Sequence, residues 1–107
     1  MTDLEITILC AQAMSLDVYK DNGVVMFRSG YRYIPLHDRA MCFSLIERFD
    51  IVIERERNNK LFGVTLFSDC ATCKTFVERS SPDLKRAICL CVARMMSTRL
   101  AELEKAK

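Results

Sequence analysis

The chain has 107 residues, of which half are hydrophobic and 28% are charged, with 16 basic and 14 acidic residues spread along it. This size and composition are typical of a single globular domain and exclude a disordered or fibrous chain. The net charge of +2 is too small for the one-signed field that nonspecific nucleic-acid binding needs. No apolar run approaches the roughly 20 residues of a membrane span, so we expect no membrane partner.

The first residues and the six cysteines predict where the protein resides. Asp3 and Glu5 stand where a signal peptide would carry basic residues, which argues against secretion. Cysteines in a chain without an export signal are typically reduced thiols. We therefore expect a cytoplasmic protein with reduced cysteines.

The N-terminal residues predict a helix followed by a hairpin. Thr2 and Glu5 have the spacing of a capping box, so a helix should run to about Ser15. Asn22-Gly23 then separates two apolar runs, and this dipeptide is typical of the type I′ turn, which needs positive φ at both positions. Residues 17–28 should therefore form an antiparallel hairpin.

The middle of the chain predicts a second helix and three strands. The helix should begin at His37 or Asp38 and end at Phe49, and strands should cover residues 50–57, 61–67 and 74–78. The run at 61–67 is apolar on both faces, as is the second strand of the hairpin. A sheet that is apolar on both faces needs helices on both faces.

The last helix has the clearest start. Ser81 can cap it, Pro82 suits the first helical position, and Asp83 complements the positive end of the helix dipole. This helix should run from Pro82 to about Leu103. The predicted order is α-β-β-α-β-β-β-α, in a single α+β domain of residues 1–107 whose antiparallel sheet is covered by helices as an α/β/α sandwich.

A CxxC motif at Cys70 and Cys73 raises the question of a metal or redox site. A structural zinc ion needs four converging ligands, but Cys89 and Cys91 at i and i+2 on a helix point about 200° apart. A thioredoxin-like pair would be followed by a helix rather than by a strand. We therefore expect a solvated loop with two thiols, no metal and no cofactor, with Cys70 and Cys73 as weak metal candidates only.

The last helix has apolar residues on more than one side. At 100° per residue, Leu90 lies opposite the main apolar stripe, with Ala93 and Leu100 beside it. One interpretation is that Leu90, Ala93, Arg94 and Leu100 seat a second copy or a partner protein. The alternative is that one exposed leucine has no special role.

Two further groups of residues could in principle carry chemistry. The sequence has no GxGxxG, P-loop or HExxH motif, and His37-Asp38 suits a helix cap better than a general base. Tyr31, Arg32 and Tyr33 could clamp a nucleotide or form an amphipathic rim. We find no catalytic constellation and expect a protein that is not an enzyme.

The order α-β-β-β-α from the second helix onward resembles a double-stranded-RNA-binding domain. In that family the start of the last helix presents several lysines to phosphates. Only Lys85 and Arg86 stand at the corresponding place, and Asp83 lies beside them. The expected lysine cluster is missing, and the N-terminal helix and hairpin are additional, so nucleic-acid binding is a minority interpretation.

Two stretches, "YIPLHDRAMCFSLIERF" and "SPDLKRAICLCVARMM", resemble small, largely uncharacterised phage and prophage proteins with an α/β/α sandwich domain. The resemblance covers nearly the whole chain in the same order of elements, although tryptophan is missing from the central strands. It implies a phage or prophage origin and a fold, and no activity. The matching positions are Tyr33, Pro35, Asp38, Ala40, Leu45, Leu84, Arg86, Ala87, Ile88, Cys89 and Ala93.

These observations lead to three functional hypotheses. The first is a phage-encoded, non-enzymatic protein in the host cytoplasm that binds and modulates a host or phage protein, in host defence or takeover, as a homodimer. The second is a nucleic-acid-binding accessory protein that uses Lys85, Arg86 and Arg94. The third is a protein that binds or sequesters a small ligand such as a nucleotide near Tyr31 and Tyr33.

Overall fold

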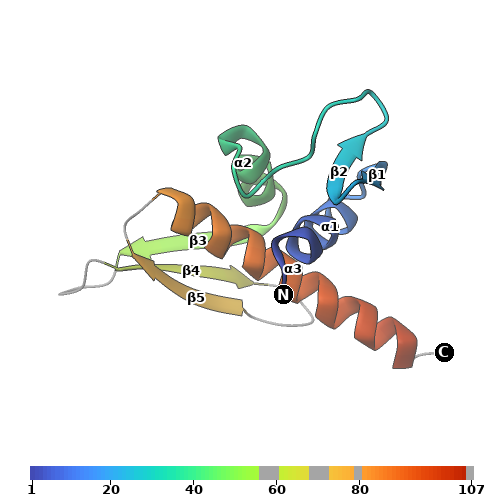
Figure 1. Ribbon diagram of the computed structural model, residues 1–107. Coiled ribbons are helices and arrows are strands. Elements are labelled where there is room, and N and C mark those ends of the chain that lie inside the picture. The colour runs from blue at the N-terminus through green and yellow to red at the C-terminus, as the bar shows by residue number, and fades with distance from the viewer. Residues whose placement is uncertain (56–60, 68–72, 79–80, 106–107) are drawn as a thin grey trace.

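Three helices and five strands follow one another in the predicted order in the computed structural model, which describes residues 1–55, 61–67, 73–78 and 81–105 (Figure 1). The α+β class is confirmed. The elements are α1 (Asp3–Ala13), β1 (Val18–Asp21), β2 (Val24–Phe27), α2 (Arg39–Arg48), β3 (Asp50–Arg55), β4 (Leu61–Phe67), β5 (Cys73–Glu78) and α3 (Ser81–Lys105).

Local side-chain chemistry sets the starts of the first two helices. The Thr2 hydroxyl accepts a hydrogen bond from the backbone N–H of Glu5 at 3.2 Å, and the Asp38 carboxylate accepts one from the N–H of Met41 at 2.9 Å. Each bond satisfies a backbone donor that the helix itself leaves free. The predicted caps of α1 and α2 are therefore confirmed.

The predicted hairpin is formed by β1 and β2. Asn22 and Gly23 have φ values of 50° and 78°, as a type I′ turn requires, and Asp21 pairs with Val24 across it. The chain after β2 then folds back along the hairpin, because the N–H of Tyr33 donates to the carbonyl of Val25 at 2.8 Å. This return places Tyr33 against β2, where its ring meets Phe27 edge to face at 5.6 Å.

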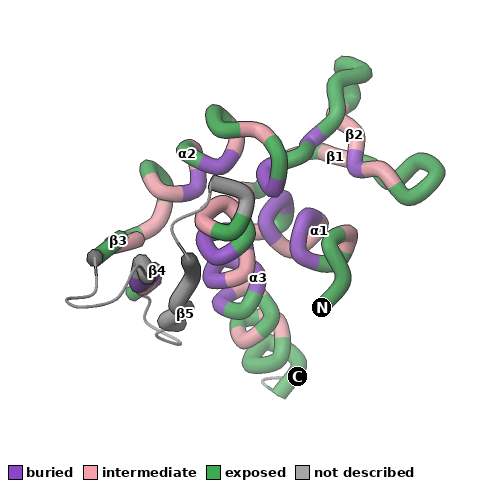
Figure 2. Tube along the Cα trace, turned by 60° about the vertical axis from the view of Figure 1, so that its left-hand side comes forward, coloured by how far each residue is buried: buried purple, intermediate pink, exposed green. Residues whose placement is uncertain are grey.

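The five strands form two sheets rather than the single sheet expected. β1 and β2 pair only with each other, and β3, β4 and β5 form an antiparallel sheet with β4 in the middle. The helices lie on one side of this three-stranded sheet, with α3 between the sheet and α1, and the hairpin packs beyond α1 (Figures 1 and 2). The apolar residues of β2 are thus covered by α1 and by the segment around Tyr33, which removes the need for a shared sheet.

The core lies around the first four turns of α3. Val64 and Leu66 of β4 pack toward α3 from one side, while Ile6 and Cys10 of α1 approach from the other, and all four are fully buried. Helix α3 is therefore buried around most of its circumference there. Its fully or almost fully buried residues are Ala87, Ile88, Cys89, Cys91, Val92, Ala93 and Met95.

Helix α1 is packed both by α3 and by the hairpin and so buries more than one side, including Ile6 and Cys10. Among the described residues, no helix combines the length and the apolar character that crossing a membrane would require.

Candidate functional site

An apolar pocket of about 510 Å³ lies between α2 and α3 and is open to solvent on one side. Its floor includes the buried Cys42 and Ile88, and its rim carries Phe43, whose side chain is 58% exposed. We call it the α2–α3 pocket. It is lined by Arg39, Ala40, Cys42, Phe43, Ile46, Leu84, Lys85 and Ile88.

The geometry of α2 explains why Phe43 is left outside. Cys42 and Leu45 face the core and are buried, and Phe43 follows Cys42 by one step of about 100° around the helix. Ile46 lies one turn after Phe43 on the same side and is half-buried. The two residues therefore form an apolar edge of α2 that the rest of the described chain does not cover.

Two cations flank the pocket. Arg39 is exposed in the first turn of α2, and Lys85 is half-buried near the start of α3. The pKa of the Cys42 thiol is raised by its hydrogen bond with the Cys89 thiol and by burial, and the positive charge of Lys85 opposes this rise. Lys85 thus places its charge close to the pocket floor.

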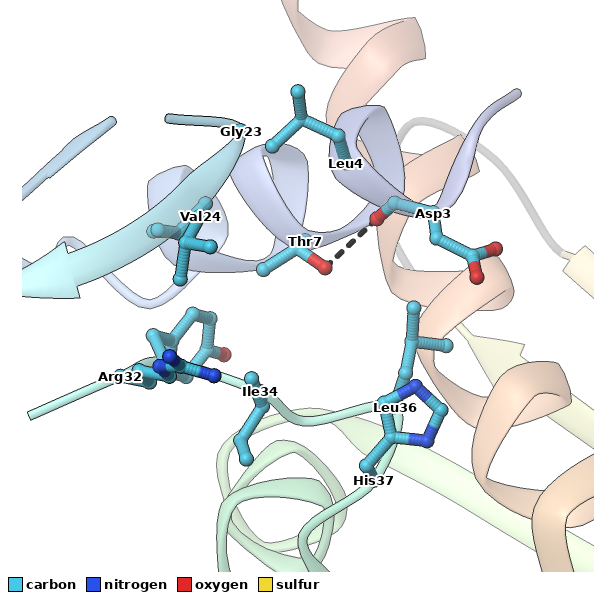
Figure 3. Close-up of a pocket in the computed structure, with 11 residues that line it drawn as sticks. Asp3, Leu4, Thr7, Gly23, Val24, Arg32, Ile34, Leu36 and His37 are labelled. Carbon is cyan, nitrogen blue, oxygen red and sulfur yellow. Dashed lines mark hydrogen bonds between the residues drawn. The ribbon is translucent and has the colours of Figure 1, made fainter. Parts of the chain in front are cut away.

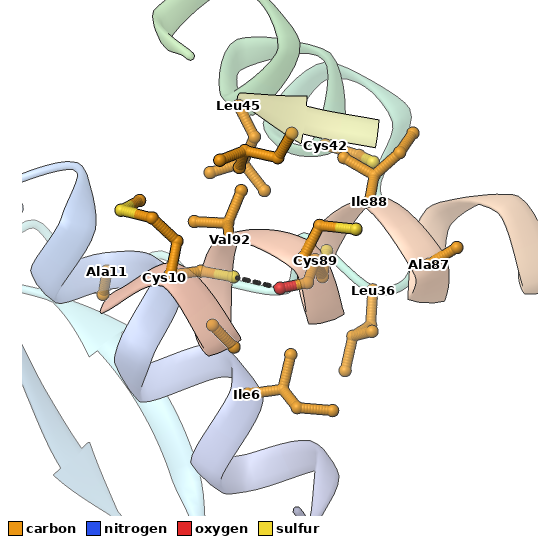
Figure 4. Packing of buried hydrophobic residues seen from close by; sticks show 14 of the residues in the cluster. Ile6, Cys10, Ala11, Leu36, Cys42, Leu45, Ala87, Ile88, Cys89 and Val92 are labelled. Carbon is orange, nitrogen blue, oxygen red and sulfur yellow. Dashed lines mark hydrogen bonds between the residues drawn. The ribbon is translucent and has the colours of Figure 1, made fainter. Parts of the chain in front are cut away.

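A cluster of buried thiols lies behind the pocket (Figure 4). The Cys10 thiol donates to the carbonyl of Cys89 at 3.3 Å, and the Cys42 thiol points to the carbonyl of Lys85 at 4.0 Å. The pKa of Cys89 is raised, chiefly by a hydrogen bond with Cys10, so both Cys42 and Cys89 stay protonated. Protonated, buried thiols are weak nucleophiles, so this cluster serves packing rather than chemistry.

Tyr33 lies beside these thiols. The side chain is only 3% exposed, and its hydroxyl finds no hydrogen-bond partner among the described residues. Burial, and then the neighbouring thiols Cys10, Cys89 and Cys42, raise the pKa of the Tyr33 hydroxyl. A tyrosine held in this way cannot stack on a ligand from solvent.

A second, smaller hollow of about 180 Å³ lies between α1, the hairpin and residues 32–37 (Figure 3). Its polar groups include Arg32, His37, Asp3 and Thr7, and the Thr7 hydroxyl is already engaged as a donor to the carbonyl of Asp3 at 2.8 Å. Sites for drug-sized ligands usually measure about 300–1,000 Å³. The hollow is thus too small for a nucleotide.

The residues proposed for a ligand or nucleic acid do not converge. Tyr31 is 74% exposed and Arg32 is exposed, whereas Tyr33 is buried. The guanidinium of Arg86 pairs with the carboxylate of Asp3 in α1, so it already has an acidic partner within the chain. Lys85 lies at the α2–α3 pocket rather than beside Tyr31.

The residues proposed as an interaction surface on the last helix differ in how far they are buried. Ala93 is completely buried and so lies in the core of this chain rather than on an open face, because α3 is covered both by α1 and by the sheet. Leu90 is half-buried and packs against the core, Leu100 is half-buried, and Arg94 is exposed. Ala93 therefore does not reach the surface, whereas an interaction through Leu90, Arg94 and Leu100 stays a prediction.

The cysteine motif falls in a part of the chain that is not described. Cys70 lies outside the described residues, and so does the side chain of Cys73, whose backbone begins β5. Within residues 1–55, 61–67, 73–78 and 81–105, no group of three or more histidine, cysteine or acidic side chains is arranged to hold a metal ion.

Sequence reasoning missed the α2–α3 pocket. Phe43 is two residues from both Met41 and Leu45, about 160° around the expected helix from each, so it lies away from these apolar residues in the same way as Leu90. This signal could have singled out Phe43. No family model, curated protein or solved structure matches the chain significantly.

Proposed function

We propose that this chain is a non-enzymatic protein-binding module that holds its partner in the α2–α3 pocket. The observation that carries the proposal is the exposed apolar edge at Phe43, which continues into a pocket of about 510 Å³. Soluble proteins rarely leave contiguous apolar surface open unless it meets another molecule. Aromatic residues on the rim of such pockets are common anchors of protein interfaces.

The contribution of Phe43 to the binding free energy follows from the exposed fraction of its side chain. A phenylalanine side chain can bury about 150–250 Å². Since 58% of Phe43 is exposed, a partner could cover on the order of 100 Å², worth about 2–3 kcal/mol at roughly 25 cal/mol per Å². This magnitude would make Phe43 a principal anchor of the complex.

The resemblance to phage and prophage proteins supports a host or phage protein as the partner, and modulation of that protein in the host cytoplasm as the outcome. The homodimer expected from the last helix stays a prediction that would use Leu90 and Leu100, since Ala93 is buried. Light scattering on the purified protein measures the oligomeric state directly and would reveal a dimer that forms through another face.

The proposal is tested by affinity capture from a lysate of the natural host, treated with nuclease, using the wild-type chain and two variants. Phe43→Ser removes the proposed anchor, and Phe67→Ser is the matched control, since Phe67 is also exposed, at 49%, but lies on β4 outside the pocket. We expect one stoichiometric protein that is lost with Phe43→Ser and kept with Phe67→Ser. Equal capture by all three chains, or capture of nucleic acid alone, would overturn the proposal.

We propose nucleic-acid binding as a second candidate function, because one structural observation favours it. Helices α2 and α3 lie on the same side of the β3-β4-β5 sheet, which is the layout of a double-stranded-RNA-binding domain (Figure 2). The pairing of Arg86 with Asp3 weakens this candidate, because among the described residues near the start of α3 it leaves only Lys85 as a cation without an ion pair.

Fluorescence anisotropy with an RNA duplex of about 16 base pairs tests this second candidate at low and at moderate salt. Binding that weakens steeply with salt and with Lys85→Ala would support it. No binding at low salt would eliminate it, and it would leave the protein-binding proposal as it stands.

A further inference from the structure

We infer that the α2–α3 pocket accepts an acidic, amphipathic helical segment of the partner protein. The inference rests on the proposed function and goes further by naming the chemistry of the occupant. It is carried by the charge, the residue spacing and the backbone of the two helices that form the pocket.

The charged groups among the described lining residues of the pocket have one sign. They are the two cations Arg39 on α2 and Lys85 on α3, and no acidic residue is among the described lining residues. Neither cation makes an ion pair with another described residue, whereas Arg28 pairs with Asp17 at 3.3 Å and Arg86 pairs with Asp3. Arg39 and Lys85 therefore remain available to a carboxylate brought by the partner.

The two cations are on opposite walls. Arg39 begins α2 and Lys85 stands in the second turn of α3, with the apolar floor at Cys42 and Ile88 between the two helices. A segment that lies along this floor would have one cation on each side. Acidic residues flanking an apolar stripe would meet both, which is the charge pattern of an acidic amphipathic helix.

The apolar residues of the pocket have helical spacing. Phe43 and Ile46 lie three residues apart on α2, and Leu84 and Ile88 lie four apart on α3. Each helix therefore presents two apolar groups about one turn, or roughly 5.4 Å, apart. Residues at i, i+3 or i+4, and i+7 of a bound helix repeat at the same interval, so they can interdigitate with these pairs.

The length of the site fits the same occupant. The 10 residues of α2 extend over about 15 Å, which matches about three turns of a helix. An extended peptide is disfavoured, because the described lining residues all belong to the two helices and none to a strand edge along which a peptide could pair. A nucleic-acid backbone is disfavoured, because the apolar floor would remove water from phosphates without replacing it.

The experiment is a selection from a random library of displayed peptides about 14 residues long, panned on the immobilised full chain. Peptides that also bind Phe43→Ser are removed, and Phe67→Ser is the control that should keep binding. Circular dichroism and thermal unfolding confirm that each variant is folded, which is expected because both side chains are exposed. We expect the retained peptides to have apolar residues at helical spacing and an excess of Asp and Glu beside them.

The affinity of one retained peptide then shows how much Arg39 and Lys85 contribute to binding. Its Kd should rise about tenfold in the double variant Arg39→Glu and Lys85→Glu, and it should rise with salt. A peptide with lysine in place of its acidic residues should bind this double variant better than it binds the wild-type chain.

The two levels of the proposal fail in different ways. Peptides that depend on Phe43 but carry no acidic excess, or that bind the double variant equally well, would overturn the acidic occupant and leave the protein-binding pocket intact. If no retained peptide depends on Phe43, the pocket itself is not a docking site and both proposals fall.

Discussion

Raising the pH above 9 should destabilise this protein through two buried thiols, Cys42 and Cys89. Both have a pKa above the ordinary value of 9.0. For Cys42 the main cause is the hydrogen bond with Cys89 followed by burial, and for Cys89 it is the hydrogen bond with Cys10. The folded chain therefore keeps two protons that the unfolded chain releases in alkaline solution.

The sign and size of the effect follow from this difference in proton binding. Below pH 9 both states hold the protons, so the full stability is present. Above pH 9 the unfolded state is favoured by about 1.4 kcal/mol per thiol for each pH unit. At pH 10 the two thiols together should lower the free energy of unfolding by about 2–3 kcal/mol. Tyr33 adds to the loss above its ordinary pKa of 10.0, because burial raises its pKa.

Urea unfolding followed by far-UV circular dichroism, with a reductant present, measures this loss at intervals between pH 7.5 and 10.5. The matched control is the double variant Cys42→Ala and Cys89→Ala. It should be less stable at pH 7.5, because it loses buried side-chain volume, yet its stability should fall less steeply above pH 9. Equal slopes for the two chains would refute the assignment of the alkaline loss to these thiols.

Two further predictions concern stability. Tyr33→Phe should leave the free energy of unfolding unchanged or raise it by up to about 1 kcal/mol, because the hydroxyl is buried without a hydrogen-bond partner among the described residues. A decrease in the free energy of unfolding of more than about 1 kcal/mol, measured by urea unfolding, would mean that the hydroxyl is paired. Gly23→Ala should cost about 1–2 kcal/mol, because φ is +78° at the hairpin turn and an added Cβ meets no atom within 4 Å, so backbone strain alone acts. An unchanged midpoint of thermal unfolding for Gly23→Ala would contradict the type I′ turn.

The sequence by itself determined the features that depend on neighbouring residues. The caps at Thr2 and Asp38 were predicted because a side chain three residues from a free N–H satisfies it wherever the helix packs. The hairpin turn at Asn22 and Gly23 was predicted because positive φ is a property of those two residues and their immediate backbone.

The tertiary structure alone decided what covers each apolar residue. Helical periodicity places both Ala93 and Phe43 off the main apolar stripes of their helices. It does not show that Ala93 is buried because α1 and the sheet enclose α3. Nor does it show that Phe43 stays exposed because no described residue covers that edge of α2. In the same way Tyr31 and Tyr33 look alike in sequence, and only the return of the chain along β2 buries one of them. Burial depends on contacts between residues far apart in the chain, and for that reason the core and the α2–α3 pocket emerged only from the folded structure.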